Sequence, residues 1–292
     1  MALSIRHDRI PVSRGNTPVP DEDTLHLPRI LCRSSARVAW FTTYCTANSN
    51  TDTTAGLHGG GVTGEVFRAQ ARSLIKHLPD FRLVFADGPF FCDPGPGIVP
   101  VYQDYGPFRR WLRWKPEHQE VDSDTTTEEI MYALETCKNE DEGDGPWVGL
   151  MGFSQGAKLA SSLLYNQQIM IEEEGKADTD YKFAVLLAGR SPIVSLCQYS
   201  RGPATVNPGD VSEGFVFEGK SPHVLKLPTI HVHGLADPGL HLHRKMLKQY
   251  HDPKTSTVLE WDGAHRVPIK KTDVDPIVTE IYRIAREQGV DV

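Results

Sequence analysis

Short apolar runs alternate with longer amphipathic stretches along most of the chain. Runs of five to seven residues bounded by Gly, Pro, Asp or Lys predict strands buried on both faces, at Phe81–Ala86, Trp147–Phe153, Phe183–Ala188, Thr229–His233 and Thr257–Trp261. The stretches between them predict helices at Glu65–His77, Glu128–Cys137, Gln155–Glu173, Leu240–Tyr250 and Ile277–Gln288. Because strands and helices alternate, the pattern predicts the α/β class, with a mostly parallel central sheet flanked by helices.

The N-terminal part departs from this alternation. Residues 1–28 are polar, contain four prolines and lack an apolar period, which predicts a flexible tail before a single domain over residues 29–292. Arg29–Cys32 begins like a first strand, but residues 33–56, rich in Ser, Thr and Asn, separate it from Leu57 and the glycines that follow. Long structureless loops are uncommon inside compact domains. If this atypical insertion is native, we expect it to lie in a surface loop beside the mouth of the candidate site described below.

Composition narrows the class of partner without naming one. The 292-residue chain carries a net charge of −7, which disfavours a protein that binds nucleic-acid phosphates or an anionic membrane. Its five cysteines are scattered and form no CxxC pair, a poor basis for a disulfide framework or a zinc site. The N-terminus has no secretory apolar run, and no stretch approaches the length of about 18 apolar residues that a membrane span needs. We therefore expect a cytoplasmic protein.

Gly152–Gly156 carries the clearest chemical signal. Its sequence Gly-Phe-Ser-Gln-Gly satisfies the pattern G-x-S-x-G and lies between a predicted strand and a predicted helix, as that pattern requires. The sharp turn strains the serine backbone, and the small flanking residues relieve the crowding. The hydroxyl would then project at a helix N-terminus, where the dipole favours developing negative charge. Ser154 is the candidate nucleophile, and a serine that caps an ordinary helix is the simpler alternative.

Two later strands end close to residues that could activate Ser154. A serine nucleophile needs a histidine base and a carboxylate that orients it, in the chain order Ser, acid, His for this architecture. Asp237 follows the strand Thr229–His233, and His265 follows the next strand. Asp262 competes for the acid role, but it follows the wrong strand and adjoins His265 in sequence. Asp237 and His265 are the predicted partners.

Two backbone segments can supply an oxyanion hole. One N–H is that of Gln155, after the nucleophile, and a second comes from a glycine-rich loop after an early strand. The run His58–Gly64 contains such a loop, and we assign Gly60 and Gly61 as its donors. A phosphate-binding loop is the alternative, but the run lacks both the Lys-Ser/Thr ending and the GxGxxG spacing.

Histidines outside this set raise the question of a metal. His231 with His233, and His241 with His243, form His-x-His pairs. No third ligand with suitable spacing accompanies either pair in the sequence. We predict neither a metal nor a cofactor.

Together these residues resemble the fungal serine-hydrolase family of the α/β-hydrolase superfamily, to which the human ovarian-tumour-associated serine hydrolase is related. The resemblance implies the α/β-hydrolase fold, with helices on both faces of the sheet, and the same triad of Ser154, Asp237 and His265. The DPGPGI and LLAGRSP motifs are similar to those of members from fungal polyketide clusters, including the lovastatin-pathway thioesterase. The resemblance covers about residues 29–288 without 33–56 and rests on HGGGVTGEVFRAQ, FADGPF, DPGPGIVP, GPFRRW, GFSQGAKLA, LLAGRSP, HVHGLADPGLHLHRKML and WDGAHRVP.

The resemblance also implies a substrate and a pocket. It suggests a serine esterase or thioesterase that releases or trims a polyketide-type acyl chain in secondary metabolism, presented by an acyl-carrier domain of a polyketide synthase. The segment Phe90–Trp114 would lie over the active site, although its aromatic residues could equally pack a loop onto the body. The candidates for an acyl pocket are Phe90, Phe91, Tyr105 and Trp111, with Tyr102, Phe108 and Trp114 as further members.

The family lacks residues 33–56, which leaves two alternatives open. Our hypothesis is that the segment is translated intron, because its removal joins family-like sequence in frame. If the segment is native, the protein could be an inactive homologue in which the insertion disrupts the oxyanion loop. A general carboxylesterase for small esters is the alternative within enzymes.

Overall fold

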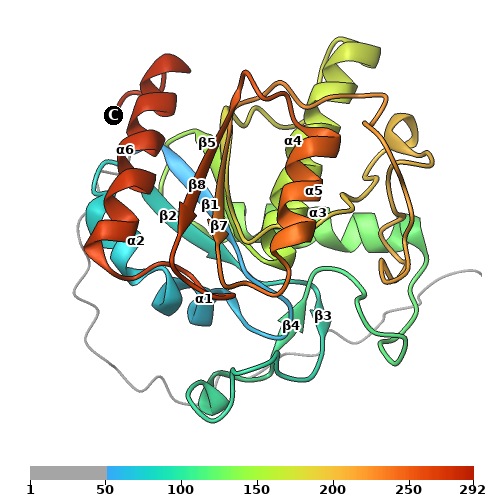
Figure 1. Cartoon of the computed structure of the whole chain (residues 1–292), viewed down its shortest axis with the longest axis horizontal. Helices are drawn as coiled ribbons and strands as arrows, with labels where there is room; N and C mark the ends of the chain where they lie inside the picture. The colour runs from blue at the N-terminus through green and yellow to red at the C-terminus, as the bar shows by residue number, and fades with distance from the viewer. Residues whose placement is uncertain (1–50) are drawn as a thin grey trace, which may run out of the picture. The chain divides into compact units, whose positions relative to one another are not determined.

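A six-stranded sheet lies at the centre of the computed structural model, which describes residues 51–292 (Figure 1). Every neighbouring pair of strands runs parallel. The C-terminal ends of the strands therefore meet at one edge, where loops can bring distant residues together. The strand order is β2-β1-β5-β6-β7-β8, with bounds β1 Thr53–Leu57, β2 Arg82–Ala86, β5 Trp147–Phe153, β6 Phe183–Leu187, β7 Thr229–Gly234 and β8 Ser256–Trp261.

Helices cover both faces of the sheet (Figure 1). On one face α3, α4 and α5 bury side chains such as Leu163 and Met246, and on the other α1, α2 and α6 bury side chains such as Phe67 and Ile281. Each such burial contributes about 1.5–3 kcal/mol. This arrangement confirms the predicted α/β-hydrolase architecture. The helix bounds are α1 Gly64–Gln70, α2 Arg72–His77, α3 Ser123–Glu140, α4 Gln155–Glu174, α5 Leu240–Tyr250 and α6 Lys271–Glu287.

Smaller elements follow β2 and β6. A short antiparallel pair, β3 (Phe90–Phe91) and β4 (Arg109–Arg110), forms a second sheet. Two single-turn 3₁₀ helices, η1 (Gln103–Tyr105) and η2 (Gln198–Ser200), lie in the connecting segments. In the part of the chain that the structure describes, no helix is both long and apolar enough to cross a membrane.

The predicted elements agree with the structure except at certain ends. All five predicted strands are present with ends within one residue. The predicted helix Glu65–His77 is two helices that meet at Ala71. The last helix begins at Lys271 rather than Ile277 and continues through Pro276, the residue at which proline chemistry would normally end it.

Strand β1 corrects the expectation for the end of the insertion. Thr53–Gly56 do not lie in a surface loop, because with Leu57 they form β1, buried between β2 and β5. Their small side chains suit this central position, and a Cβ on Gly56 would overlap the Phe85 ring. The sequence pattern missed this strand because Thr, Thr, Ala and Gly give no strong apolar signal.

The remaining N-terminal predictions lie outside the described residues. These are the tail over residues 1–28, the strand Arg29–Cys32 and the first part of the insertion, residues 33–50. The domain boundary at residue 29 stays a prediction.

Candidate active site

Ser154 lies in a strained turn between β5 and α4. Its φ of 54° and ψ of −110° fall outside the regions that L-residues ordinarily occupy. The flanking glycines make the turn possible, because a Cβ on Gly152 would overlap the Gly156 backbone and a Cβ on Gly156 would overlap the Leu57 carbonyl. Such strain persists only where the surroundings impose it, and it concentrates at functional sites. The turn holds the Ser154 hydroxyl at the N-terminus of α4.

Three side chains from three strand ends form a continuous chain of hydrogen bonds. Ser154 follows β5, Asp237 follows β7 and His265 follows β8. The His265 Nε2 lies 2.9 Å from the Ser154 Oγ, and the His265 Nδ1 lies 2.6 Å from the Asp237 Oδ2. Because an ionised carboxylate only accepts, Nδ1 donates to Asp237 and Nε2 is left to accept from the Ser154 hydroxyl. The structure thus brings together the three residues that the sequence singled out.

The Asp237 carboxylate is buried and well partnered. Its side chain is 0% exposed, and its Oδ1 accepts from the Gly239 N–H at 2.7 Å and from the Arg190 guanidinium at 3.3 Å. Burial alone raises the pKa of Asp237, but the hydrogen bonds from His265 and Gly239 outweigh burial and the net effect lowers the pKa. Asp237 is therefore ionised at neutral pH, as a residue that orients and stabilises an imidazolium must be.

His265 is held in its neutral form. Burial lowers its pKa, the hydrogen bond to Asp237 opposes this, and the positive charge of Arg190 lowers the pKa further. The Arg190 guanidinium lies 3.3 Å from the His265 Nδ1, but both groups are donors when Nδ1 bonds Asp237, so Arg190 acts on the ring through its charge. A neutral imidazole is the form that can take the Ser154 proton.

Two contacts of Asp237 were missed by the sequence analysis. Arg190 follows β6 closely, so its position at the same edge of the parallel sheet could have been anticipated. His243, on α5, is fully buried with its Nε2 3.4 Å from the Asp237 Oδ2. Its place within a helix gave no signal of this contact.

Neighbouring segments fix the glycine loop after β1. The His58 Nδ1 donates to the Gly59 carbonyl at 2.6 Å, and the Nε2 accepts from the Gly88 N–H at 2.8 Å. Burial lowers the pKa of His58 to about 4, so the ring is neutral with one fixed tautomer. The Gly61 N–H donates to the Arg109 carbonyl at 2.9 Å. This bond removes Gly61 from the predicted oxyanion donors.

The Gln155 side chain ties the nucleophile turn to the segment 111–114. Its Oε1 accepts from the Trp111 N–H at 2.8 Å and the Leu112 N–H at 3.1 Å, and its Nε2 donates to the Leu112 carbonyl at 3.0 Å. The backbone N–H of Gln155 opens α4, and the N–H groups of a first helical turn have no intrahelical partner. Gln155 thus combines a positioning side chain with a backbone donor next to Ser154.

A cavity of about 970 Å³ opens beside Ser154 and His265. Its volume is at the upper end of the range of about 300–1,000 Å³ for small-molecule sites. Of the seven aromatic residues proposed for an acyl pocket, Tyr102 and Trp114 line it. Its apolar wall also includes Val62, Ile98, Val194, Val206 and Leu242.

The aromatic residues placed first in the pocket prediction lie elsewhere. Phe90, Phe91, Tyr105 and Trp111 do not line the cavity, and neither does Phe108. Phe91 and Tyr105 are exposed, whereas Trp111 is fully buried and donates its indole N–H to the His58 carbonyl at 3.1 Å. Aromatic residues of this segment serve packing and hydrogen bonding more than they shape the cavity.

Comparison with known proteins assigns the family. A family model described as serine hydrolase (FSH1) matches residues 49–277. The chain belongs to this serine hydrolase family.

Relatives include "Esterase citA" from Monascus ruber, 42% identical over 275 residues, which cover 92% of this chain and 96% of the relative. "Esterase pigG" from the same organism is 43% identical over 288 residues, which cover 92% of this chain and 96% of the relative. "Probable esterase tazC" from Aspergillus terreus is 43% identical over 281 residues, which cover 92% and 97%.

The site of this serine hydrolase also contains three side chains whose spacing alone would allow them to bind a metal ion. Ligand atoms of Asp237, His243 and His265 lie within 4.8 Å of one another. Both nitrogens of His265 are engaged, however, one with Asp237 and one with Ser154. A metal bound by this set would have to break the bond between His265 and Asp237, so the arrangement suits proton transfer better than metal ligation.

Proposed function

We propose that this serine hydrolase cleaves esters or thioesters, with Ser154 as nucleophile, His265 as general base and acid, and Asp237 as the group that orients the imidazole. The observation that carries the proposal is the hydrogen-bonded chain from the Ser154 Oγ through His265 to Asp237, at 2.9 and 2.6 Å, beside a large cavity. The relatives named as esterases support an acyl substrate.

The proposed reaction consists of two acyl transfers. The Ser154 Oγ attacks the acyl carbonyl carbon while its proton moves to the His265 Nε2, and the backbone N–H groups of Gln155 and Gly60 stabilise the resulting oxyanion. Collapse expels the alcohol or thiol, which takes the proton from His265 and leaves an ester on Ser154. Water then attacks this ester while His265 takes its proton, and collapse returns that proton to the Ser154 Oγ and releases the carboxylic acid. A hydroxyl of the acyl chain in place of water would give a lactone.

The acyl part is proposed to be a polyketide-type chain of fungal secondary metabolism, presented as a thioester on an acyl-carrier domain. The resemblance carried by the DPGPGIVP and LLAGRSP motifs supports this assignment. The cavity volume of about 970 Å³ and its apolar wall also favour a chain longer than that of a simple acetyl ester.

The geometry around β1 argues against a disrupted homologue. Thr53–Leu57 complete the strand that leads into the glycine loop, and His58 and Arg109 hold that loop in place. The end of the insertion therefore supports the loop rather than displacing it. The hypothesis that residues 33–56 are translated intron does not fit the end of this segment, because Thr53–Gly56 belong to the central strand β1 and the family model matches from residue 49. For residues 33–48 it stays a prediction, and transcripts that all encode these residues would contradict it.

The experiment compares acyl-carrier thioesters with short-chain nitrophenyl esters as substrates of the purified full chain. We expect higher kcat/KM for carrier-bound chains and loss of both activities in Ser154→Ala. Faster turnover of the short nitrophenyl esters would contradict the polyketide assignment and favour a general carboxylesterase. Activity that survives Ser154→Ala, with contaminating esterases excluded, would contradict the whole proposal.

A further inference from the structure

Lys158 lies one helical turn after Ser154, in the wall of the same cavity. Its backbone N–H donates to the Ser154 carbonyl at 3.1 Å. Side chains of a helix lean toward its N-terminus, the end of α4 that Ser154 precedes. Ser154 and Lys158 both line the cavity. The Lys158 side chain therefore borders the space in which Ser154 would meet an acyl group.

The Lys158 side chain is buried, and no carboxylate of residues 51–292 forms an ion pair with it. The residue is 9% exposed, and its Nζ donates to the Ser212 hydroxyl at 2.9 Å. An ammonium carries three N–H donors, so this contact satisfies only one of them. Within residues 51–292 the ion pairs of lysines belong to other lysines, namely Lys182, Lys226, Lys245 and Lys271.

Burial of the Lys158 ammonium costs folding free energy, and packing alone gives no reason for a lysine at this position. Burying an ammonium without an ionic partner is expensive, and a methionine or leucine would fill the same space without that penalty. Burial and, to a smaller degree, the charge of Arg190 lower the pKa of Lys158 to about 8. The ammonium is therefore mostly protonated at pH 7, and its countercharge is expected to come from a ligand.

The other charges of the cavity wall leave this countercharge unassigned. The other cations of the wall are Arg72, Arg113, Arg190 and Arg266, of which Arg190 is paired with Asp237 and Arg113 with Glu120. The two carboxylates in the wall, Asp210 and Glu213, belong to exposed residues, and Asp210 accepts a hydrogen bond from Asn207 at 2.9 Å. The apolar side chains of the wall cannot compensate a charge.

We propose that Lys158 binds an anionic oxygen on the acyl part of the substrate, such as a carboxylate a few bonds from the carbonyl that Ser154 attacks. The proposal rests on the proposed function of Ser154 and deepens it, because it selects acidic acyl chains over neutral ones. An anionic oxygen could also come from the leaving group, for example the phosphates of a coenzyme A thioester. The buried position of Lys158 on α4 favours the acyl part, since the leaving group departs toward solvent and its charges can stay hydrated.

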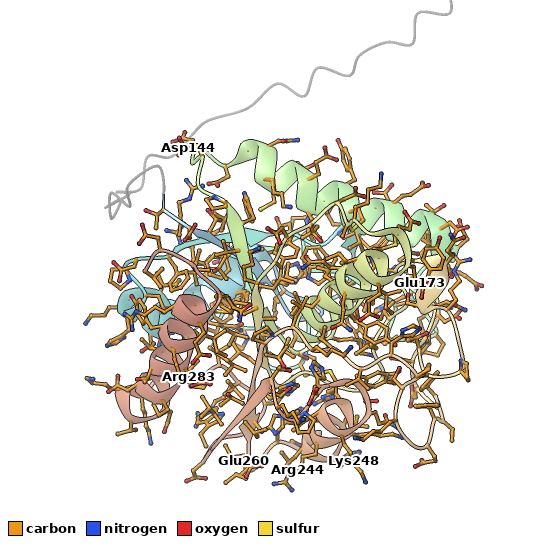
Figure 2. The ribbon with its side chains drawn as sticks, turned by 90° about the horizontal axis from the view of Figure 1, so that it is seen from above. Asp144, Glu173, Arg244, Lys248, Glu260 and Arg283 are labelled. Atoms are coloured by element: carbon orange, nitrogen blue, oxygen red, sulfur yellow. The ribbon has the colours of Figure 1, made fainter. Side chains whose placement is uncertain are left out.

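The experiment uses three thioesters of N-acetylcysteamine with the full chain: adipoyl with a free carboxylate, its methyl ester, and hexanoyl. Thiol release gives kcat and KM for the wild type and for Lys158→Met, which removes the charge and keeps much of the volume. Lys248→Met is the matched control, because Lys248 lies on the exposed side of α5 and its replacement changes the net charge equally (Figure 2). Hexanoyl-coenzyme A tests the leaving-group alternative.

The wild type should prefer the adipoyl carboxylate to its methyl ester by about tenfold to a hundredfold in kcat/KM, the range expected of a hydrogen bond to a charged group. Lys158→Met should abolish this preference, mainly through KM, and should lower kcat/KM far more for the acidic adipoyl thioester than for hexanoyl. Lys248→Met should behave as the wild type does.

Three results separate the failure of this inference from the failure of the proposed function. Equal turnover of the acidic and neutral adipoyl thioesters by the wild type would overturn the role of Lys158, whatever the fate of the variant. A loss confined to hexanoyl-coenzyme A in Lys158→Met would overturn the acyl-part assignment and place the anion on the leaving group. Absence of turnover for all substrates, with no labelling of Ser154 by a fluorophosphonate, would overturn the proposed function and the inference that rests on it.

Discussion

His265 lies beside a group of buried histidines near β7 and β8, and it differs from them in its hydrogen-bond partners and in its access to the cavity. The His265 side chain is 30% exposed, opens onto the cavity and has both ring nitrogens hydrogen-bonded. His231, His233 and His243 are at most 1% exposed and keep ring nitrogens without a hydrogen-bond partner among the described residues. The ring centroids of His243 and His265 are only 6.4 Å apart.

Hydrogen-bond partners and access to the cavity therefore distinguish a reactive imidazole from one that only fills space in the core. In the buried group, which also includes His251, burial lowers the pKa of each ring and keeps it neutral. These rings pack edge against face or tilted, with centroids 4.4–5.9 Å apart. Among these five rings, His265 is the one that joins a carboxylate on one side to a hydroxyl on the other.

Replacement of the Asp237 carboxylate, which accepts the hydrogen bond from His265, should have the strongest effect on activity. Asp237→Asn should lower kcat by about 10⁴-fold, because an amide cannot hold the imidazole in the required tautomer or stabilise its charge. Asp262→Asn is the matched control, because Asp262 is exposed and lies three residues from His265. Asp262 was also the alternative candidate for the acid in the sequence. A loss of activity in Asp262→Asn comparable to that in Asp237→Asn would show that the structure assigns the wrong acid.

The pH dependence of activity should report the environment of His265. The base must be neutral, and because burial and Arg190 lower its pKa, the acidic limb of kcat/KM should fall below pH 6.5. Each pH unit below that pKa should cost about tenfold in rate. Arg190→Met should move the limb to higher pH, because it removes a positive charge beside the ring. An acidic limb above pH 6.5 in the wild type would contradict this description.

The buried histidines should make the fold sensitive to mild acid. Their folded pKa values lie below the unfolded value of about 6.5, to about 4 for His233 and about 3 for His251. The unfolded chain therefore binds more protons below pH 6.5. Stability should be complete above that pH and fall as pH decreases, by about 1.4 kcal/mol per pH unit for each such histidine. Urea unfolding at pH 7 and pH 5.5 measures this loss, and equal stabilities would contradict it.

The smallest expected effect is the difference in stability between replacing His233 and replacing His251, two members of the buried group. His233→Phe replaces a ring whose Nδ1 has no partner among the described residues, so stability at pH 7 should change by less than about 1 kcal/mol, and the acid sensitivity should decrease. His251→Phe is the comparison, because both nitrogens of His251 lie near hydroxyls, Ser161 at 3.0 Å and Thr229 at 3.2 Å. It should cost about 1–3 kcal/mol. Equal costs for the two variants would refute this ordering.

The sequence pattern predicted the residues at the strand ends better than it predicted the residues of the cavity wall, and the reason is physical. Ser154, Asp237 and His265 each follow a buried apolar strand, and parallel strands bring their C-terminal ends to one edge whatever the loops do. The cavity wall comes from loops such as 95–98 and 206–213, whose side chains follow no period. Aromatic content alone did not locate it, as Trp111 shows.

Strand β1 and Lys158 illustrate two further limits of the sequence. Thr53–Gly56 form a buried strand from small residues, since the space between β2 and β5 decides what fits there. Lys158 has an unremarkable helical position, and its missing countercharge becomes visible only with the cavity and Ser212 in view. Tertiary packing therefore carried the information that local pattern lacked.

Labelling of the purified full chain with a fluorophosphonate probe shows whether Ser154 is an activated nucleophile, because the probe reacts only with an activated serine. We expect stoichiometric labelling that disappears in Ser154→Ala, with the modified peptide containing Ser154. Labelling that persists in Ser154→Ala would contradict the assignment of the nucleophile. Absence of labelling from the correctly folded full chain would contradict the claim that this chain carries a working site.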